Sequence, residues 1–203
     1  MNYGFAYRIG FHPWEDAVDQ PEFTAKITEL FEREESERVA PFGRALDIGT
    51  GSGIWGIELA KRGWNVTGVD IIENALERAR ERAGREHVDM ELVNGDVTNL
   101  RAAGVGEDFR LVLDTGTFHD FDTEQQQAMG RGVDAIAAPD ATVLLLCWPR
   151  RRRPLIRGVE RNEIEAAFPG WKITDIEPSG FSAPKPLEVL LRPDEHWYRL
   201  RRE

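Results

Sequence analysis

Three glycines at alternate positions, set between two acids, are the residues best suited to bind a ligand. Asp47 lies inside a short apolar run, 45–48, and Asp70 follows a second apolar run, 65–69. The glycines fill the turn after the first run: Gly49, Gly51 and Gly53. Glycine permits a tight turn and close approach of a ligand, and the free amides of a following helix N-terminus attract one. An acid after the next strand can accept hydrogen bonds from two ribose hydroxyls, so the pattern predicts a nucleoside-like ligand.

The identity of that nucleoside stays open at this point, because the same turn fits a dinucleotide motif. Gly51, Gly53 and Gly56 spell GxGxxG, and Asp70 lies about where a dinucleotide fold places its ribose acid. A single GxGxxG is weak evidence for a nicotinamide or flavin enzyme. The acid inside the first strand, Asp47, argues against that interpretation.

Two more acids follow predicted strands further along the chain. Asp96 comes after the run 88–93, and Asp114 ends the run 109–113. The carboxyl ends of parallel strands meet at one edge of the sheet, which is where such folds bind ligands. We therefore expect these acids to lie on the same edge as Asp70.

The elements that must position these residues follow from apolar spacing and from capping signals. Apolar runs predict strands over 45–48, 65–69, 88–93, 109–113, 141–148, 171–176 and 187–191. Helical spacing predicts helices over 21–38, from Ile54 to near Gly63, from Ile72 to Gly84, over 122–138, and from Asn162 to Pro169. Capping boxes are expected at Asp122 with Gln125 and at Asn162 with Glu165.

These elements predict a single α/β domain over residues 1–203. The loop before the last strand is too short for a crossover helix, so the last two strands must be antiparallel. The expected fold is a three-layer αβα sandwich around a seven-stranded, mostly parallel, Rossmann-like sheet with a C-terminal β-hairpin. Residues 1–40 are expected to form an aromatic arm and a helix that cover the ligand site, and residues 44–203 the core.

Composition argues against several classes of function. The 203 residues carry a net charge of −10 and are 41% hydrophobic and 31% charged, as in soluble globular proteins. The negative charge argues against a nucleic-acid partner. No apolar run approaches the roughly 18 residues of a membrane span, and we identify no signal peptide. One cysteine, Cys147, excludes an internal disulfide and favours a cytoplasmic setting, and the four histidines lack metal-ligand spacing, so no metal is expected.

On these motifs, the chain from about residue 20 to 203 resembles the class I S-adenosylmethionine-dependent methyltransferases. The resemblance rests on the DIGTGSG turn over 47–53, Asp70, the pair Asp96-Val97, and Asp114. It implies that Asp70 holds the ribose hydroxyls, Asp96 the adenine amine and Val97 the ring face, while the turn lies under the methionine part. The implied cofactor site comprises Asp47, Gly49, Thr50, Gly51, Gly53, Asp70, Ile71, Asp96, Val97, Asp114 and Thr115. A looser similarity to the thiopurine and tellurite-resistance groups adds Trp14.

The charge of the cofactor favours this resemblance over a dinucleotide. S-adenosylmethionine carries a sulfonium and an ammonium and no phosphate, so acids attract it, whereas they would repel a pyrophosphate. The favoured function is transfer of a methyl group to an O, N or S atom of a small molecule. The alternatives are an NAD(P)-dependent oxidoreductase and a non-catalytic protein that binds S-adenosylmethionine.

His119 is the predicted general base. It follows Asp114 by five residues, directly past the fourth strand. An oxygen or nitrogen nucleophile can require removal of its proton, and a free imidazole titrates near neutral pH. The alternative is a loop histidine that caps the next helix or bonds to the backbone.

Aromatic and basic residues predict the character of the acceptor. The rings expected to wall its pocket are Tyr7, Phe11, Phe118 and Trp148. Arg150 begins a run of four arginines after the fifth strand and is expected to bind a carboxylate or phosphate. The acceptor is thus expected to be a small aromatic or anionic molecule, and the protein a monomer or homodimer.

Overall fold

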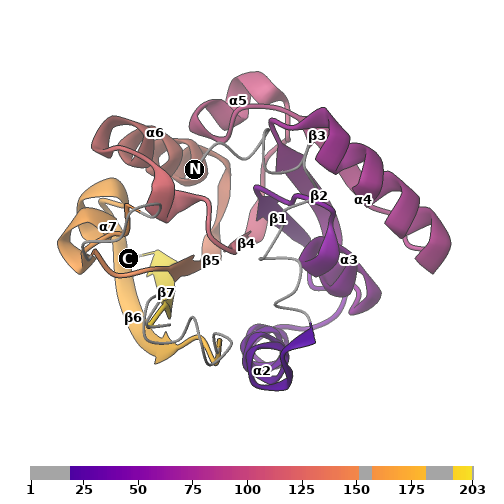
Figure 1. Ribbon diagram of the computed structural model, residues 1–203, viewed down its shortest axis with the longest axis horizontal. Helices are drawn as coiled ribbons and strands as arrows, with labels where there is room; N and C mark the ends of the chain where they lie inside the picture. The colour runs from indigo at the N-terminus through magenta and orange to yellow at the C-terminus, as the bar shows by residue number, and fades with distance from the viewer. Residues whose placement is uncertain (1–18, 151–156, 182–193, 203) are drawn as a thin grey trace, which may run out of the picture.

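The computed structural model describes residues 19–150, 157–181 and 194–202, which form one seven-stranded sheet and its flanking helices (Figure 1). The strands are β1 (Arg44–Ile48), β2 (Asn65–Asp70), β3 (Glu91–Asn94), β4 (Phe109–Asp114), β5 (Ala137–Cys147), β6 (Trp171–Pro178) and β7 (His196–Arg202). The α-helices are α2 (Pro21–Ser36), α3 (Ile54–Lys61), α4 (Glu73–Glu86), α5 (Leu100–Ala103), α6 (Thr123–Ile136) and α7 (Arg161–Ala167). Two short 3₁₀ helices are η2 (Val97–Asn99) and η3 (Phe118–Asp120). Within these described ranges, every helix is too short or too polar to cross a membrane.

The strand order confirms the predicted sheet. The strands lie in the order β3-β2-β1-β4-β5-β7-β6. Strands β1 to β5 pair in parallel, and β7 runs antiparallel to both β5 and β6. The chain order reverses between β1 and β4, and open sheets of this kind bind ligands at the carboxyl ends of the strands beside such a reversal. The turn after β1 therefore lies where a ligand site is expected.

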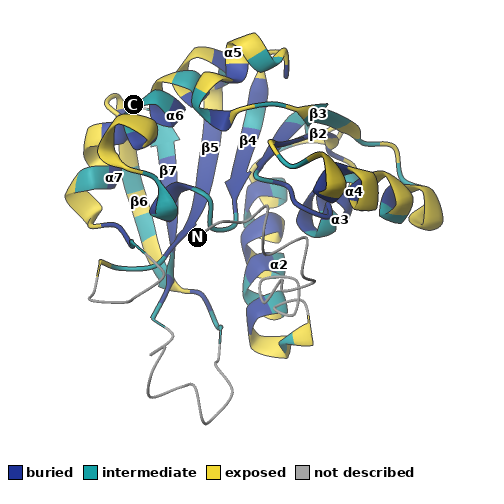
Figure 2. Ribbon diagram, turned by 45° about the horizontal axis from the view of Figure 1, so that its top comes forward, coloured by how far each residue is buried: buried dark blue, intermediate teal, exposed yellow. Residues whose placement is uncertain are grey.

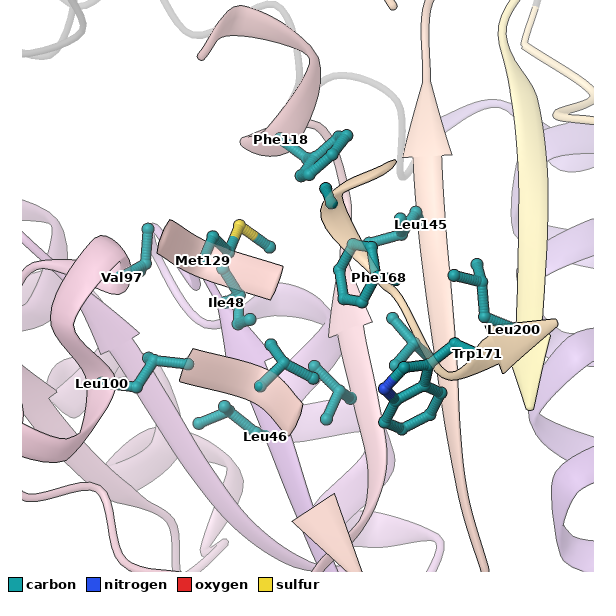
Figure 3. Close-up of a cluster of buried hydrophobic side chains, with 14 of the residues drawn as sticks. Leu46, Ile48, Val97, Leu100, Phe118, Met129, Leu145, Phe168, Trp171 and Leu200 are labelled. Atoms are coloured by element: carbon teal, nitrogen blue, oxygen red, sulfur yellow. The ribbon is translucent and has the colours of Figure 1, made fainter. Parts of the chain in front are cut away.

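Two apolar clusters cover the opposite faces of the sheet and make the fold a three-layer sandwich. Alternate residues of one strand point to opposite faces, so Ala45 packs with α2 and α3 while Leu46 packs with α6 and α7. Figure 3 shows the second cluster, in which side chains of the strands meet those of the helices, including Leu46, Ile48, Leu145, Met129, Phe168 and Trp171. The central strands are therefore buried on both faces, as their continuous apolar runs predict.

Helix α2 packs along one face of the sheet with a buried apolar stripe (Figure 2). The stripe has helical spacing and comprises Phe23, Ile27, Leu30 and Phe31. Glu34 continues it as a fully buried acid, and its carboxylate accepts hydrogen bonds from Arg38 at 2.7 Å and from Arg199 of β7 at 2.6 Å. These charge-assisted bonds fix the C-terminal end of α2 against the amino edge of the sheet, so its N-terminal end lies at the carboxyl edge.

Several predicted boundaries are corrected. Helix α4 passes through Gly84 and ends at Glu86, and His87, with a φ of 55°, forms its left-handed cap. Strand β3 begins at Glu91 and not at Val88. The capping box of α6 at Asp122 and Gln125 is confirmed, with both hydrogen bonds present. The box of α7 is formed by Glu160 and Glu163, two residues before the predicted pair, because the helix starts at Arg161.

The last strand also differs from its prediction. Residues 187–191 lie outside the described residues, and the strand that pairs with both β5 and β6 is His196–Arg202. Its alternating pattern of apolar and basic residues gave a weaker signal than the apolar run before it. The antiparallel pairing of the last two strands is nevertheless confirmed.

Candidate functional site

The glycine turn after β1 has the backbone geometry that its composition predicts. Its three glycines all adopt positive φ, with 63° at Gly49, 54° at Gly51 and 77° at Gly53. The first also touches another loop, because a Cβ built on Gly49 would lie 2.0 Å from Oγ1 of Thr117. Any other residue in this turn would be strained, and at Gly49 it would also collide with the loop after β4.

Asp47 is a buried acid beneath this turn. Its Oδ2 accepts a hydrogen bond from Oγ1 of Thr50 at 2.6 Å, and its Oδ1 is buried with no hydrogen-bond partner among the described residues. Burial raises the pKa of Asp47 to about 7, against the opposing effect of the Thr50 hydrogen bond and with support from the charge of Asp114. A buried oxygen without a donor is a place for a cationic or hydrogen-bonding group of a ligand.

Asp70 connects the end of β2 to the glycine turn. Its Oδ2 accepts a hydrogen bond from the amide of Gly51 at 2.9 Å and its Oδ1 accepts one from Ile72 at 2.8 Å. Burial raises its pKa, although these backbone amides oppose the rise. A carboxylate has about four acceptor positions, so both oxygens can accept further bonds from a ligand. The neighbouring Ile71 is 67% exposed, unlike most large apolar residues that the structure describes.

The residues after β3 are placed less favourably for the roles implied by the resemblance. Asp96 is exposed, and its Oδ1 caps η2 by accepting bonds from the amide and hydroxyl of Thr98. Val97 is buried in the core cluster with Leu100, which leaves little of its side chain for an adenine ring. The amide of Gly95 donates to the carbonyl of Asp70 at 3.0 Å, so this segment does lie beside the end of β2.

Asp114, at the end of β4, is fully buried and does not present its carboxylate to a ligand. Oδ1 accepts hydrogen bonds from the amides of Gly116 at 2.7 Å and Thr117 at 2.6 Å, and Oδ2 accepts one from Phe118 at 2.9 Å. Three backbone amides of its own loop surround the side chain, and the expected contact of Asp114 with the cofactor stays a prediction. Thr115 lies half-buried in the same loop.

His119 lies in η3, within this loop, and is 5% exposed. Its Nδ1 is 3.4 Å from the carbonyl oxygen of Leu146 near the end of β5, and its Nε2 is 4.0 Å from Oδ1 of Asp120. A Cβ built on Gly116 would approach Cε1 of His119 to 3.2 Å, so glycine at this position leaves room for the imidazole. The structure thus places the predicted base on the same edge as the glycine turn, against the neighbouring strand.

Five rings, here called the edge aromatic cluster, gather near the carboxyl edge of the sheet: Phe23, Trp55, Trp148, Phe181 and Trp197. Trp55 follows the glycine turn, and Trp148 follows the last residue of β5, with its ring centroid 6.4 Å from that of Phe181. Phe118 is not part of this group. It is fully buried in the opposite cluster, where it packs on Phe168 at 5.7 Å, so its expected place in a pocket wall is corrected.

The described arginines of the basic segment bind other parts of the protein. Arg150 pairs with Glu163 of α7 at 2.5 Å. Arg157 donates to the carbonyl of Phe121 and to Oγ1 of Thr123 at 3.3 Å. These contacts reduce the support for an anion-binding role of Arg150.

Three predicted site residues, Tyr7, Phe11 and Trp14, lie outside the described residues. Conversely, the sequence did not identify Phe181 as part of this edge. Phe181 lies in a segment rich in glycine, serine and proline, a composition typical of a loop. Its aromatic ring alone could have suggested a place at the site.

The electrostatics of the edge fit S-adenosylmethionine and do not fit a pyrophosphate. Burial raises the pKa of both Asp47 and Asp70, so a positive charge that binds beside them favours their ionised forms. A sulfonium and an ammonium supply that charge, whereas phosphates would add repulsion. No group of three metal-ligating side chains occurs within residues 19–150, 157–181 and 194–202.

Comparison with known proteins agrees with this geometry. A family model described as a methyltransferase domain matches residues 45–140. The 2-heptyl-1-hydroxyquinolin-4(1H)-one methyltransferase of Mycobacteroides abscessus is 25% identical over 177 residues, which cover 82% of this chain and 71% of that protein. A putative methyltransferase of Geobacillus sp. is 32% identical over 88 residues, which cover 43% of this chain and only 36% of that protein.

The fold has solved counterparts as well. The 1,6-didemethyltoxoflavin-N1-methyltransferase of Burkholderia thailandensis, solved with 1,6-didemethyltoxoflavin and S-adenosylhomocysteine bound, aligns with a TM-score of 0.74. The alignment covers 99% of this chain and 85% of that one at 18% sequence identity, so it shows that the two proteins share a fold. The family match includes the glycine turn and the acids Asp47, Asp70, Asp96 and Asp114, so residues 45–140 carry a methyltransferase domain, and the chain as a whole is similar to S-adenosylmethionine-dependent class I methyltransferases.

Proposed function

We propose that this enzyme transfers the methyl group of S-adenosylmethionine to an oxygen or nitrogen atom of a small aromatic molecule, with His119 as general base. The observation that carries the proposal is the contact between the glycine turn and the loop of His119. A Cβ on Gly49 would overlap Thr117, two residues before the histidine, so the two loops lie in direct contact. A base on the second loop is therefore close to whatever the first loop binds.

The chain's own residues divide into those that hold the cofactor and those that prepare the acceptor. When bound, S-adenosylmethionine supplies a methyl group already activated by a sulfonium. Asp70 would accept hydrogen bonds from the ribose hydroxyls, the glycine turn would hold the methionine part, and Asp47 would attract its positive charge. Alignment of two reactants in attack geometry can contribute roughly 7–11 kcal/mol, so most of the work of the protein is positioning.

The surroundings of His119 select the tautomer that a base requires. The carbonyl of Leu146 can only accept a hydrogen bond, so the Nδ1 beside it carries the proton in the neutral ring. The lone pair then lies on Nε2, which can take a proton from a hydroxyl or ring N–H. Asp120, whose Oδ1 lies 4.0 Å from Nε2, stabilises the imidazolium that forms.

The edge aromatic cluster supports an aromatic acceptor over an anionic one. Trp148 follows β5, the strand against which His119 rests, and its ring contacts that of Phe181, which follows β6; both residues are partly exposed. Flat rings stack on such surfaces with about 0.5–1.5 kcal/mol beyond the burial of area. Arg150 and Arg157, in contrast, bind Glu163 and the loop after η3. The names of two similar proteins, a hydroxyquinolinone methyltransferase and a didemethyltoxoflavin methyltransferase, point to ring compounds too.

An acceptor panel tests this function. Phenols, hydroxyquinolines and heteroaromatic N–H compounds are each paired with a saturated analogue that carries the same nucleophile, and formation of S-adenosylhomocysteine is measured. We expect turnover of aromatic members and little of the saturated ones. Trp148→Ala should raise KM for the aromatic acceptor about tenfold, the loss of a ring contact, while Trp148→Phe keeps most of the affinity. Equal rates for the saturated members would refute an aromatic acceptor.

Replacement of His119 tests the base. His119→Ala and His119→Gln should lower kcat by about 100- to 10,000-fold, because proton removal is lost, and leave the affinity for S-adenosylmethionine within about twofold. Calorimetry supplies the affinity and a coupled assay supplies kcat. Turnover equal to that of the unmodified enzyme would remove His119 from the mechanism.

A further inference from the structure

The carboxylate of Asp114 organises the loop that carries His119. Three consecutive amides, those of Gly116, Thr117 and Phe118, donate to its two oxygens at 2.6–2.9 Å. Asp114 is fully buried, and His119 is the next residue after the last of these amides. A carboxylate that accepts several backbone N–H bonds holds a turn more firmly than a neutral side chain can, because charge-assisted bonds are about twice as strong.

Two further contacts hold the same loop from other elements. Nε2 of Gln126, a buried residue of α6, donates to the carbonyl of Phe118 at 3.3 Å. Arg157 donates to the carbonyl of Phe121, just past η3. The imidazole itself meets the backbone of β5 at Leu146. The loop is thus held from within by Asp114 and from outside by α6 and by the segment before α7.

We propose that Asp114 is a positioning residue for His119: its buried carboxylate fixes the loop so that the imidazole rests against β5, and it does not bind the cofactor. Gln126 assists it by anchoring the carbonyl of Phe118. The inference rests on the proposed role of His119 as base. It differs from the cofactor contact implied by the resemblance, because the Asp114 side chain is fully buried and its two oxygens accept three amides of its own loop.

Asparagine is the informative replacement at this position. Its amide nitrogen is a donor and would oppose the backbone N–H groups that one carboxylate oxygen now accepts. Asp114→Asn therefore keeps the size of the side chain and breaks the loop contacts. Gln126→Met, which removes only the bond to Phe118, serves as a second and milder variant should Asp114→Asn fold poorly.

A double-mutant cycle with His119→Ala separates positioning from other roles. We expect Asp114→Asn to lower kcat about 10- to 100-fold, less than loss of the base itself, with cofactor affinity by calorimetry within about twofold. In the His119→Ala background, Asp114→Asn should lower kcat by no more than about twofold, because the group that it positions is gone. Gln126→Met should behave alike with a smaller loss. Asp122→Ala removes the exposed cap of α6 as the matched control and should lower the unfolding temperature without changing kcat.

A second readout needs no acceptor. The imidazole C–H signals of cofactor-free protein are followed by NMR at a single pH. In Asp114→Asn the chemical shifts of His119 should change, because the loop no longer holds the imidazole against the carbonyl of Leu146, while those of His87 and His196 stay in place.

The outcomes are distinct. A tenfold loss of cofactor affinity in Asp114→Asn would make Asp114 a cofactor ligand and overturn the proposal. Equal losses of kcat with and without His119, or an unmoved His119 signal, would overturn it too. Unchanged kcat in His119→Ala alone would instead refute the base, which is the proposed function and not the positioning.

Discussion

Asp47 is a buried acid whose charge state determines how strongly the edge attracts a cation. Its pKa of about 7 in the folded protein exceeds the 3.8 of an ordinary aspartate because of burial. The folded state therefore holds a proton between about pH 4 and 7 that the unfolded chain has lost. The stability that this proton supplies is fully present below pH 4 and is lost as pH rises through 7, a difference of about 4 kcal/mol.

A bound cation opposes this dependence, because it favours the ionised form of Asp47. Thermal unfolding between pH 5.5 and 8.5 should show stability of the cofactor-free protein falling as pH rises. The extra stability conferred by S-adenosylmethionine should grow over the same range, because ionised Asp47 attracts it. In Asp47→Asn both trends should flatten. An extra stability that is constant with pH in the unmodified protein would contradict this role of Asp47.

The sequence predicted that acids lie at the strand ends, but it predicted the roles of these acids only in part. Asp47 and Asp70 lie at the glycine turn as predicted, because the turn and the next strand fix both positions. Asp114 looked equivalent to them, and the structure shows its oxygens occupied by the amides of its own loop. Which atoms a buried carboxylate accepts depends on the local path of the chain, which spacing alone does not specify.

At the scale of elements, one position in the glycine turn, Gly49, must meet two structural requirements. Gly49 needs a positive φ and also leaves room for Thr117. Periodicity predicted the turn and the helix after it, since both are local. The close approach of a loop 68 positions later, at Thr117, is a tertiary contact that no local pattern carries.

Substitution of Gly49 separates these two constraints. Gly49→Ala should destabilise the fold by at least about 1–2 kcal/mol through backbone strain, and by more through the collision with Thr117. Combination with Thr117→Ala should restore only the part of the stability that is lost through the collision. Gly84→Ala is the matched control, because a Cβ there meets nothing within 4 Å and the residue is helical, so we expect a gain of about 1 kcal/mol. Chemical unfolding measures the stability of the three variants and of the parent; a Gly49→Ala protein as stable as the parent would refute the strain.

The predicted element boundaries were wrong where a residue other than the expected one ends a helix or lies in a strand. His87 caps α4 in the left-handed conformation that glycine usually fills, and Gly84 stays helical three residues before it. The strand His196–Arg202 mixes apolar with basic residues because Arg199 is needed for the buried pair with Glu34 of α2. Such tertiary requirements override local propensity.

At the scale of the whole molecule, the sheet places its chemistry on one edge and its stabilising charges on the other. The glycine turn, Asp70 and the loop of His119 follow the carboxyl ends of β1, β2 and β4. Arg38 and Glu34 bind at the amino edge, where Arg38 reaches the carbonyl of Arg110. The order of strands and helices was predictable because each βα unit is local and its handedness is fixed. The edge aromatic cluster was not predictable, since its five rings come from five separate segments.

Titration of the protein with S-adenosylmethionine by calorimetry tests the location of this site most directly. We predict saturable binding of one equivalent, no binding of NAD, and a loss of about 10- to 100-fold in affinity for Asp70→Asn, since bonds from a charged acceptor to the ribose are lost. Asp122 is the exposed N-cap of α6, and the Asp122→Asn protein should bind S-adenosylmethionine with the affinity of the parent. Undiminished affinity in a correctly folded Asp70→Asn protein, or binding of NAD in place of S-adenosylmethionine, would contradict a cofactor site at the carboxyl edge of β1 and β2.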